Sequence, residues 1–130
     1  MSFKYFVSSK RKRAGDCAVR CIMAAENMYW AEAYNKLCNK GLEMMLMPND
    51  IIVIEKVLKD YGYVVEKAPM VLKSDGKKRR NTVREFAKNN KKGTFILSLS
   101  GHIVCLKDGD WYDTWDCSDY KVFKVFRKVG

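Results

Sequence analysis

The chain has 130 residues, 48% of them hydrophobic, which is enough apolar surface for one compact domain spanning residues 1–130. It carries 25 Lys and Arg against 15 Asp and Glu, so its formal net charge of +10 would attract an acidic partner. No apolar run reaches the ~18 residues of a membrane span and no signal peptide is recognisable, so we expect a cytoplasmic protein and not a membrane protein.

The cysteine content points to a reducing compartment. The sequence has five cysteines, which is an odd number, and no recognisable export signal. We therefore do not expect a disulfide framework. We therefore expect reduced thiols at all five positions, which are Cys17, Cys21, Cys38, Cys105 and Cys117.

The first predicted element is a helix that begins at a cysteine. A basic run at residues 10–13 is followed by Ala14-Gly15-Asp16, which predicts a loop with Asp16 as the capping residue of a helix. Apolar residues then recur at helical spacing and predict a buried helix over residues 17–27, with Ala18, Cys21, Ile22 and Ala25 on its core face.

Two more helices follow in the first half of the chain. The pattern predicts a second helix over residues 30–39, ended by Gly41. Pro48-Asn49-Asp50 opens a third helix, which stops at Tyr61-Gly62. Its apolar residues share one face: Ile51, Ile54, Val57 and Leu58.

The middle of the chain mixes short elements. Residues 63–65 predict a short strand, and the polar, basic residues 73–80 predict an exposed loop. Thr82-Val83-Arg84-Glu85 has the form of a capping box and predicts a short helix to about Asn89.

The last third is predicted to form strands. Four β-type runs cover residues 95–99, 102–106, 111–115 and 120–126, with a tight turn at Asp108-Gly109. The predicted fold class is therefore α+β, with N-terminal helices packed on a C-terminal antiparallel sheet.

Cys17 and His102 are the candidate nucleophile and base. A thiol attacks a carbonyl carbon as thiolate, and a helix N-terminus lowers the pKa of a cysteine placed there. His102 is the single histidine of the chain and begins a predicted strand. A cysteine and a histidine in this order indicate nucleophilic catalysis.

The third group of such a site would be an acid that orients the imidazole. If residues 107–110 connect two antiparallel strands, Leu106 pairs with Trp111 and Asp113 lies diagonal to His102 on the same face. A change of one residue in the loop would bring Asp116 to that face instead. Asp113 is the first candidate for the acid that orients His102, and Asp116 is the second. If Asp113 has this role, we expect Asp116 to cap the turn at residues 117–119.

These residues carry a family resemblance. Gly15-Asp16-Cys17-Ala18-Val19-Arg20 resembles the nucleophile segment of papain-like peptidases, especially double-glycine leader peptidases and small phage-encoded relatives that begin Asp-Cys-x-x-Arg. Gly101-His102-Ile103-Val104 resembles their histidine strand, and Tyr112-Asp113-Thr114-Trp115 resembles the Asn/Asp-Ser-Trp stretch. The similarity runs in order through nearly the whole chain.

The resemblance implies a papain-like fold and a cysteine peptidase that cleaves a peptide or isopeptide bond in a bacterial or phage-infected cell. It implies that Trp115 shields the His102–Asp113 hydrogen bond and that the backbone N–H of Cys17 binds the oxyanion. The family usually has a glutamine before the cysteine as the second oxyanion donor, whereas this chain has Lys10-Arg11-Lys12-Arg13. Arg11 or Lys12 would have to donate instead.

Three alternatives to a cysteine peptidase also fit parts of this sequence. Cys17 and Cys21 have Cys-x3-Cys spacing, but structural zinc sites favour tighter cysteine knuckles, so we expect neither a metal nor a cofactor. A weak or inactive papain-like module could instead bind a host protein or nucleic acid through residues 10–13 and 77–80, although no RNA-binding motif is present. A transglutaminase-like acyl transferase would use the same three residue types, with an amine in place of water. We favour a peptide or protein substrate.

Overall fold

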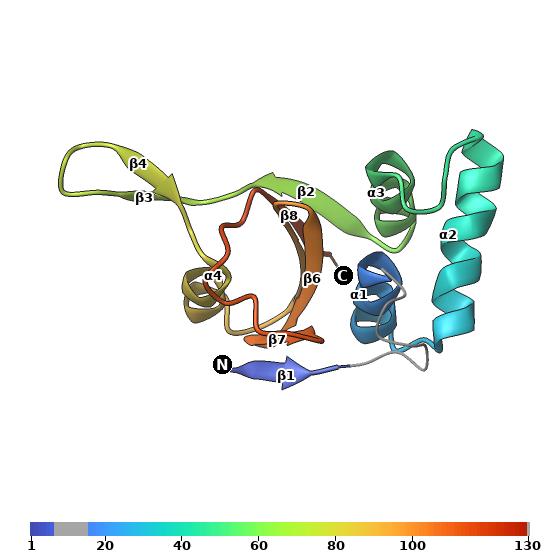
Figure 1. Ribbon diagram of the computed structural model, residues 1–130, viewed down its shortest axis with the longest axis horizontal. Coiled ribbons are helices and arrows are strands. Elements are labelled where there is room, and N and C mark those ends of the chain that lie inside the picture. The colour runs from blue at the N-terminus through green and yellow to red at the C-terminus, as the bar shows by residue number, and fades with distance from the viewer. Residues whose placement is uncertain (7–15, 130) are drawn as a thin grey trace.

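The structure is a computed structural model that describes residues 1–6 and 16–129. A six-stranded sheet lies between a layer of three helices and a single short helix (Figure 1), which is an α+β architecture. The helices are α1 (Cys17–Glu26), α2 (Trp30–Met44), α3 (Ile51–Asp60) and α4 (Val83–Asn89). The strands of the sheet, in spatial order, are β1 (Phe3–Tyr5), β7 (Asp110–Asp113), β6 (His102–Lys107), β5 (Thr94–Leu99), β8 (Lys124–Lys128) and β2 (Tyr63–Lys67).

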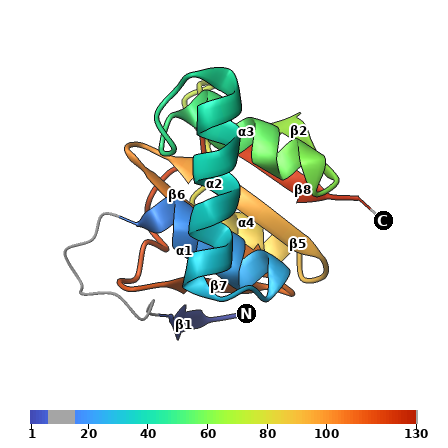
Figure 2. The same cartoon turned by 90° about the vertical axis from the view of Figure 1, so that its right-hand side faces the viewer.

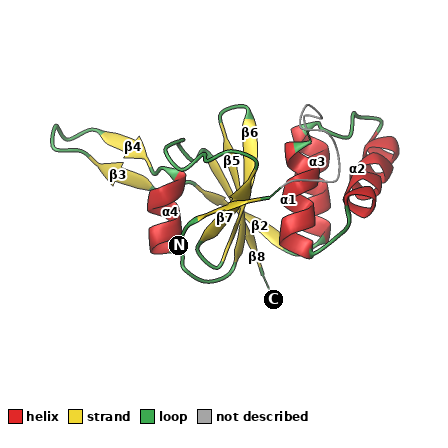
Figure 3. Ribbon diagram, turned by 60° about the horizontal axis from the view of Figure 1, so that its bottom comes forward, coloured by secondary structure: helices red, strands yellow, loops and turns green. Residues whose placement is uncertain are grey.

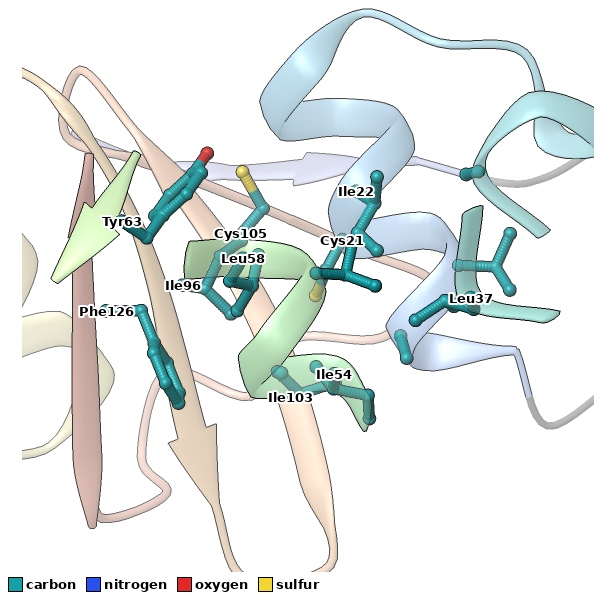
Figure 4. Close-up of a cluster of buried hydrophobic side chains, with 14 of the residues drawn as sticks. Cys21, Ile22, Leu37, Ile54, Leu58, Tyr63, Ile96, Ile103, Cys105 and Phe126 are labelled. Atoms are coloured by element: carbon teal, nitrogen blue, oxygen red, sulfur yellow. The ribbon is translucent and has the colours of Figure 1, made fainter. Parts of the chain in front are cut away.

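The central strands are buried on both faces because helices cover both sides of the sheet. Side chains alternate along a strand, so Ile96 and Cys105 face α1 and α3, whereas Leu97 and Val104 belong to the cluster that includes α4. Figure 4 shows the first cluster, where β-strand residues such as Ile103 and Phe126 meet the helical layer. The two-sided burial explains why β5 and β6 read as nearly continuous apolar runs.

The helical layer places α1 directly on the sheet. α1 contacts β5, β6 and β7, while α2 packs on α1 and α3 from the outer side, as Figure 2 shows. The predicted core face of α1 is confirmed for Ala18, Cys21 and Ile22, and Val19 and Ala24 are buried as well. This packing brings the N-terminus of α1 toward the start of β6.

Two helix predictions need correction. α2 continues to Met44, past Gly41. A Cβ at Gly41 would lie 2.7 Å from the carbonyl oxygen of Leu46, so the glycine permits the close approach of the chain that follows the helix and does not end the helix. On α3 the buried face uses Val53 together with the predicted Ile54, Val57 and Leu58, whereas Ile51 is 46% exposed.

The predicted antiparallel pairing of the C-terminal strands is confirmed for β5, β6, β7 and β8, but the complete sheet is mixed because an N-terminal strand joins it. β1 pairs parallel to β7, with Phe3 opposite Trp111 and Tyr5 opposite Asp113. β7 ends at Asp113, where the backbone N–H of Thr114 donates to the Asp113 carboxylate. β8 begins only at Lys124, where its pairing with both β5 and β2 starts.

The predicted loop at residues 73–80 is partly a hairpin. β3 (Met70–Leu72) pairs with β4 (Lys78–Arg80) in a separate two-stranded sheet that projects from the body (Figure 3). The turn between them contains Gly76 at φ +84°, and the segment is mostly exposed, as predicted.

The capping box of α4 is confirmed by reciprocal hydrogen bonds between Thr82 and Glu85. Within the described part of the chain, no helix combines the length and apolar character that crossing a bilayer requires.

Candidate active site

Cys17 is the first residue of α1 and lies half-buried at its N-terminus, as predicted. Asp16 occupies the capping position, but its side chain does not cap the helix. Its carboxylate instead binds the guanidinium of Arg20 and accepts a hydrogen bond from Trp30 Nε1 at 2.9 Å. The prediction of a side-chain cap at Asp16 was therefore wrong, because two stronger partners compete for the carboxylate.

His102 begins β6 opposite Leu99, after the two-residue turn Ser100-Gly101. Its Nε2 atom lies 2.5 Å from Oδ2 of Asp113, the last residue of β7. The other ring nitrogen, Nδ1, is left for Cys17, whose thiol is hydrogen bonded to the imidazole. The chain Cys17–His102–Asp113 therefore joins the helical layer to two strands of the sheet.

The register that places Asp113 is the predicted one. Leu106 pairs with Trp111, and the turn at Asp108-Gly109 has both residues at positive φ, 51° and 85°. Such a two-residue turn keeps the parity of the strands, so Asp113 lies on the face of His102. Asp116 instead accepts hydrogen bonds from Trp111 Nε1 and the Ser118 N–H, each at 3.0 Å, so it caps the following turn.

The environment favours a thiolate beside an imidazolium. Burial alone would raise the pKa of Cys17, but the hydrogen bond to His102, the charges of His102 and Arg20, and the N–H of Ile103 together lower it. Burial alone would lower the pKa of His102, but hydrogen bonds to Asp113 and Cys17 raise it to about 9. The pKa of the thiol is thus lowered and that of the imidazole raised, the two directions that favour a thiolate–imidazolium pair.

Arg20 links the acid of this chain to Asp16. Its side chain is 12% exposed, and its Nη2 atom lies 3.5 Å from Oδ1 of Asp113 while Nη1 binds Asp16. Asp113 itself is 2% exposed. Sequence reasoning gave Arg20 no individual role, although Asp16 and Arg20 have the i,i+4 spacing at which opposite charges pair on a helix.

An aromatic side chain lies over the outer side of the imidazole. The ring centroid of Trp115 is 4.9 Å from that of His102, and Tyr120 contacts Trp115 in turn. Trp115 is 39% exposed, so it separates the His102 ring from solvent on one side. The resemblance implied that Trp115 shields the His102–Asp113 hydrogen bond, and the structure places its ring against the imidazole that makes this bond.

Three of the other cysteines differ from Cys17 in their burial and in the direction of their pKa shift. Cys21, Cys105 and Cys117 are buried, and burial raises the pKa of each thiol, to about 12 for Cys105 and Cys117. Cys117 also approaches His102 and Asp113, and the ligand-type atoms of these three residues lie within 4.8 Å of one another. Nε2 of His102 and Oδ2 of Asp113 are joined by a hydrogen bond, and the Cys117 thiol is hydrogen bonded to Asp113, so the three side chains form a hydrogen-bonded cluster.

The oxyanion side of the site is only partly described. Arg11 and Lys12 lie outside the described residues, so their predicted contribution is not located. At the start of α1, no side-chain bond from Asp16 engages the first N–H groups of the helix, so the backbone N–H of Cys17 remains the candidate donor.

A pocket of about 720 Å³ opens beside the Cys17 side chain. It is lined by the first turn of α1, one face of α2, the corner between α2 and α3, Ile54 of α3, and Gly101, which directly precedes His102. Trp30 and Tyr34 stack within this lining, with ring centroids 4.9 Å apart. The nucleophile candidate is therefore reachable from a mostly apolar depression.

Comparison with protein-family models, with curated proteins and with solved structures found no match to the chain. A functional interpretation therefore depends on the geometry of the Cys17 site itself.

Proposed function

We propose that the protein is a papain-like cysteine hydrolase that cleaves a peptide or isopeptide bond. Cys17 is the nucleophile, His102 the general base and acid, and Asp113 the group that orients the imidazole. The observation that carries the proposal is the hydrogen-bonded chain Cys17–His102–Asp113, assembled from a helix N-terminus and two strand ends. A nucleophile, a base and an orienting group within hydrogen-bond reach are the arrangement that covalent acyl transfer needs.

The geometry supports the following first step. The Cys17 thiolate attacks the scissile carbonyl carbon, a C–S bond forms, and the carbonyl π electrons move to oxygen, where the N–H of Cys17 stabilises the negative charge. The His102 imidazolium gives its proton to the leaving nitrogen as the C–N bond breaks. An acyl thioester on Cys17 remains.

The second step restores the enzyme. His102, now neutral, takes a proton from water, whose oxygen attacks the thioester carbon. Collapse of this intermediate breaks the C–S bond and releases the carboxylic acid product and the Cys17 thiolate. Asp113 holds Nε2 of His102 throughout, so that Nδ1 keeps facing the sulfur.

The proposal also includes the type of substrate and the cellular location, both of which are expectations from the sequence. The substrate is a peptide or protein, for which the net charge of +10 favours acidic character. The resemblance of the sequence to double-glycine leader peptidases and small phage-encoded proteins supports a location in the cytoplasm of a bacterial or phage-infected cell.

Alkylation of the thiols against pH tests the activated nucleophile. With iodoacetamide between pH 5 and pH 10, Cys17 should react fastest of the five cysteines, with a midpoint below the ordinary thiol value of ~8.5. Replacing His102 by Ala removes the main groups that lower the thiol pKa and leaves its burial, so the midpoint should rise. Mass spectrometry of digested protein follows each cysteine separately.

Cys38 serves as a control within each sample, because it is partly exposed on α2 and makes no contact with His102 in the described structure. A Cys17 midpoint near ~8.5 that His102→Ala does not move would leave the chain without an activated nucleophile. Hydrolysis itself is read from a peptide library in ¹⁸O-labelled water: wild type should create new carboxyl termini that carry the label, and Cys17→Ala should create none. Products joined to an added amine would identify acyl transfer instead.

A further inference from the structure

The hairpin of β3 and β4 turns one of its faces to solvent. Paired residues of two antiparallel strands have their side chains on the same face, and Met70 pairs with Arg80. Two residues further along, Leu72 pairs with Lys78 and lies on that face as well. These four residues, the hairpin face, are all exposed, Leu72 to 69% and Met70 to 48%. The hairpin face therefore has an apolar row on β3 beside a cationic row on β4.

The opposite face of the hairpin is attached to the body of the protein. Val71 and Arg79 lie on it, and the two terminal guanidinium nitrogens of Arg79 each donate to a carboxylate oxygen of Glu85 on α4, at 2.7 Å. Beyond β4, the Val122 N–H donates to the carbonyl oxygen of Asn81 at 2.8 Å. These contacts fix the direction of the hairpin, so the hairpin face is presented as an ordered surface.

An aromatic ring extends the hairpin face toward the main sheet. The guanidinium carbon of Arg80 lies 4.6 Å from the ring centroid of Phe123, which is 46% exposed. Within the part of the chain that the structure describes, neither Lys78 nor Arg80 forms an ion pair with an acidic side chain. Both positive charges are therefore available to a partner.

We propose that the hairpin face and Phe123 together form a docking surface for a protein segment that carries acidic side chains beside apolar ones. The carboxylates of that segment pair with Lys78 and Arg80. Its apolar side chains cover the exposed aliphatic row of β3 and the Phe123 ring.

The apolar row decides which class of partner the surface fits. The sequence alone allowed the basic residues 77–80 to bind either a protein or nucleic acid. Phosphate groups would pair with the cations, and bases would stack on an aromatic ring, but neither covers Met70 and Leu72. A segment with carboxylates beside apolar side chains matches both rows at once, and the net charge of +10 speeds its approach.

The docking surface is separate from the Cys17 site. The hairpin projects at the end of the molecule opposite to α1, α2 and α3 (Figure 1 and Figure 3). None of the residues of the docking surface lines the pocket beside Cys17. The inference therefore goes beyond the proposed hydrolase and applies to a partner that is bound without being cleaved.

Four acetylated hexapeptides test the chemistry of the partner. They alternate Glu with Leu, Gln with Leu, Glu with Ser, or Lys with Leu. The Glu–Leu peptide should cause saturable NMR shifts at the methyl groups of Met70 and Leu72, with an affinity at least ~5-fold above that of the Gln–Leu and Glu–Ser peptides, because both rows contribute. The Lys–Leu peptide should bind most weakly, because like charges repel. Missing shifts, or equal affinities for the four peptides, would overturn the proposal.

Two pairs of variants locate the binding. Leu72→Ser and Lys78→Glu should each lower the affinity for the Glu–Leu peptide by at least ~5-fold, and Lys78→Glu should raise that for the Lys–Leu peptide. Leu42→Ser and Lys36→Glu are the matched controls, because they make the same changes at exposed positions of α2. Equal affinities of each variant and its control would show that the peptide does not bind at the hairpin.

Two further measurements separate this proposal from its competitors. A ten-nucleotide oligothymidine is titrated in the same buffer, and tighter binding than that of the Glu–Leu peptide, lost in Lys78→Glu but not in Leu72→Ser, would assign the surface to nucleic acid and overturn the proposal. Cys17→Ala should keep the full affinity for the Glu–Leu peptide, so the docking surface and the hydrolase function can fail independently. Leu72→Ser should keep the wild-type alkylation profile of Cys17, which shows that the fold around the thiol is retained. Loss of peptide binding in Cys17→Ala would place the peptide at the thiol and contradict the docking surface.

Discussion

The carboxylate of Asp113 is held from three sides. Oδ2 contacts Nε2 of His102 at 2.5 Å, while Oδ1 accepts from the Thr114 N–H at 2.7 Å and faces Arg20 at 3.5 Å. A carboxylate that is 2% exposed needs such partners, because burial of an unpaired charge is costly. The geometry therefore leaves the His102 ring one orientation, with Nδ1 toward Cys17.

Replacement of the two neighbouring acids should give different results. Asp113→Asn should lower turnover by at least ~10²-fold, though less than Cys17→Ala, because the orienting group acts through the imidazole and forms no covalent intermediate. Asp116→Asn should leave the Cys17 alkylation profile unchanged, because Asp116 binds Trp111 and Ser118 instead of His102. The measurements are substrate turnover and the pH midpoint of Cys17 alkylation. The reverse pattern would make Asp116 the orienting acid.

Arg20 should act as a positioning residue. Its guanidinium bridges Asp16 and Asp113 and also lowers the pKa of Cys17, so Arg20→Met should raise the pH midpoint of Cys17 alkylation. Arg20→Lys keeps the charge but loses the planar fork, so its midpoint should fall between wild type and Arg20→Met.

Arg84→Met is the control for this series, because Arg84 pairs with Asp119 on an exposed surface and makes none of these contacts. Circular dichroism of each variant establishes that the fold is retained before the midpoints are compared. A structural role alone would lower stability without moving the alkylation midpoint. An unchanged midpoint in a folded Arg20→Lys and a folded Arg20→Met would therefore contradict the positioning role.

At the scale of single elements, α4 shows how local sequence can set a helix start. Glu85 accepts a hydrogen bond from the Thr82 N–H at 2.9 Å and binds Arg79 through both oxygens, each at 2.7 Å. The hydrogen bonds with Arg79 and the Thr82 backbone lower the pKa of Glu85 to about 2. α4 and its capping box join the β3–β4 hairpin to the sheet through these contacts.

Loss of the Glu85 carboxylate should destabilise the protein at neutral pH but have little effect at strongly acidic pH. Glu85→Gln should reduce the free energy of unfolding by about 1 kcal/mol at pH 7, the size of a helix-cap effect with a partly exposed ion pair. Since the folded-state pKa is depressed, the contribution is complete above the ordinary glutamate pKa and is lost as pH falls toward about 2. Urea unfolding at pH 7 and pH 2.5 measures it.

Glu43→Gln is the matched control, because Glu43 is 68% exposed and outside any capping box. It should change the free energy of unfolding by a few tenths of a kcal/mol or less at either pH. An equal loss for Glu85→Gln at pH 7 and pH 2.5 would show that ionisation of Glu85 contributes nothing to stability.

At the scale of the whole molecule, the candidate site depends on the contact between layers. Cys17 comes from α1 in the helical layer, whereas His102 and Asp113 come from β6 and β7. The buried cluster between them includes Ile22 and Ile103 and is continuous from helices to sheet. The proposed activation of the thiol would therefore require α1 to be docked on the sheet.

Loss of Cys17 reactivity should coincide with global unfolding in urea. We expect the midpoint for selective alkylation of Cys17 and the midpoint for far-ultraviolet circular dichroism to agree, as in a single cooperative unit. Ile22→Ala should lower both midpoints together, since truncating a side chain that is 1% exposed costs ~2–5 kcal/mol. If alkylation selectivity were lost at lower urea than the helical signal, the helical layer would undock on its own and the single-domain prediction would fail.

The sequence by itself determined the elements whose signals are local. The apolar runs of β5 and β6, the helical spacing from Cys17, the capping box at Thr82 and the positive-φ turn at Asp108-Gly109 each depend on residues a few positions apart. Strand parity then followed from the turn, which is why Asp113 could be selected over Asp116. These features needed no knowledge of distant partners.

Only the tertiary structure decided the features that depend on distant contacts. The parallel pairing of β1 with β7, the burial of Val53 in place of Ile51 on α3 and the engagement of Asp16 by Trp30 depend on contacts that no short window contains. The pocket beside Cys17 likewise arises only when α1, α2 and the α2–α3 corner come together. The physical reason is that local patterns report which face a residue prefers, whereas the partner it meets there depends on how all elements pack.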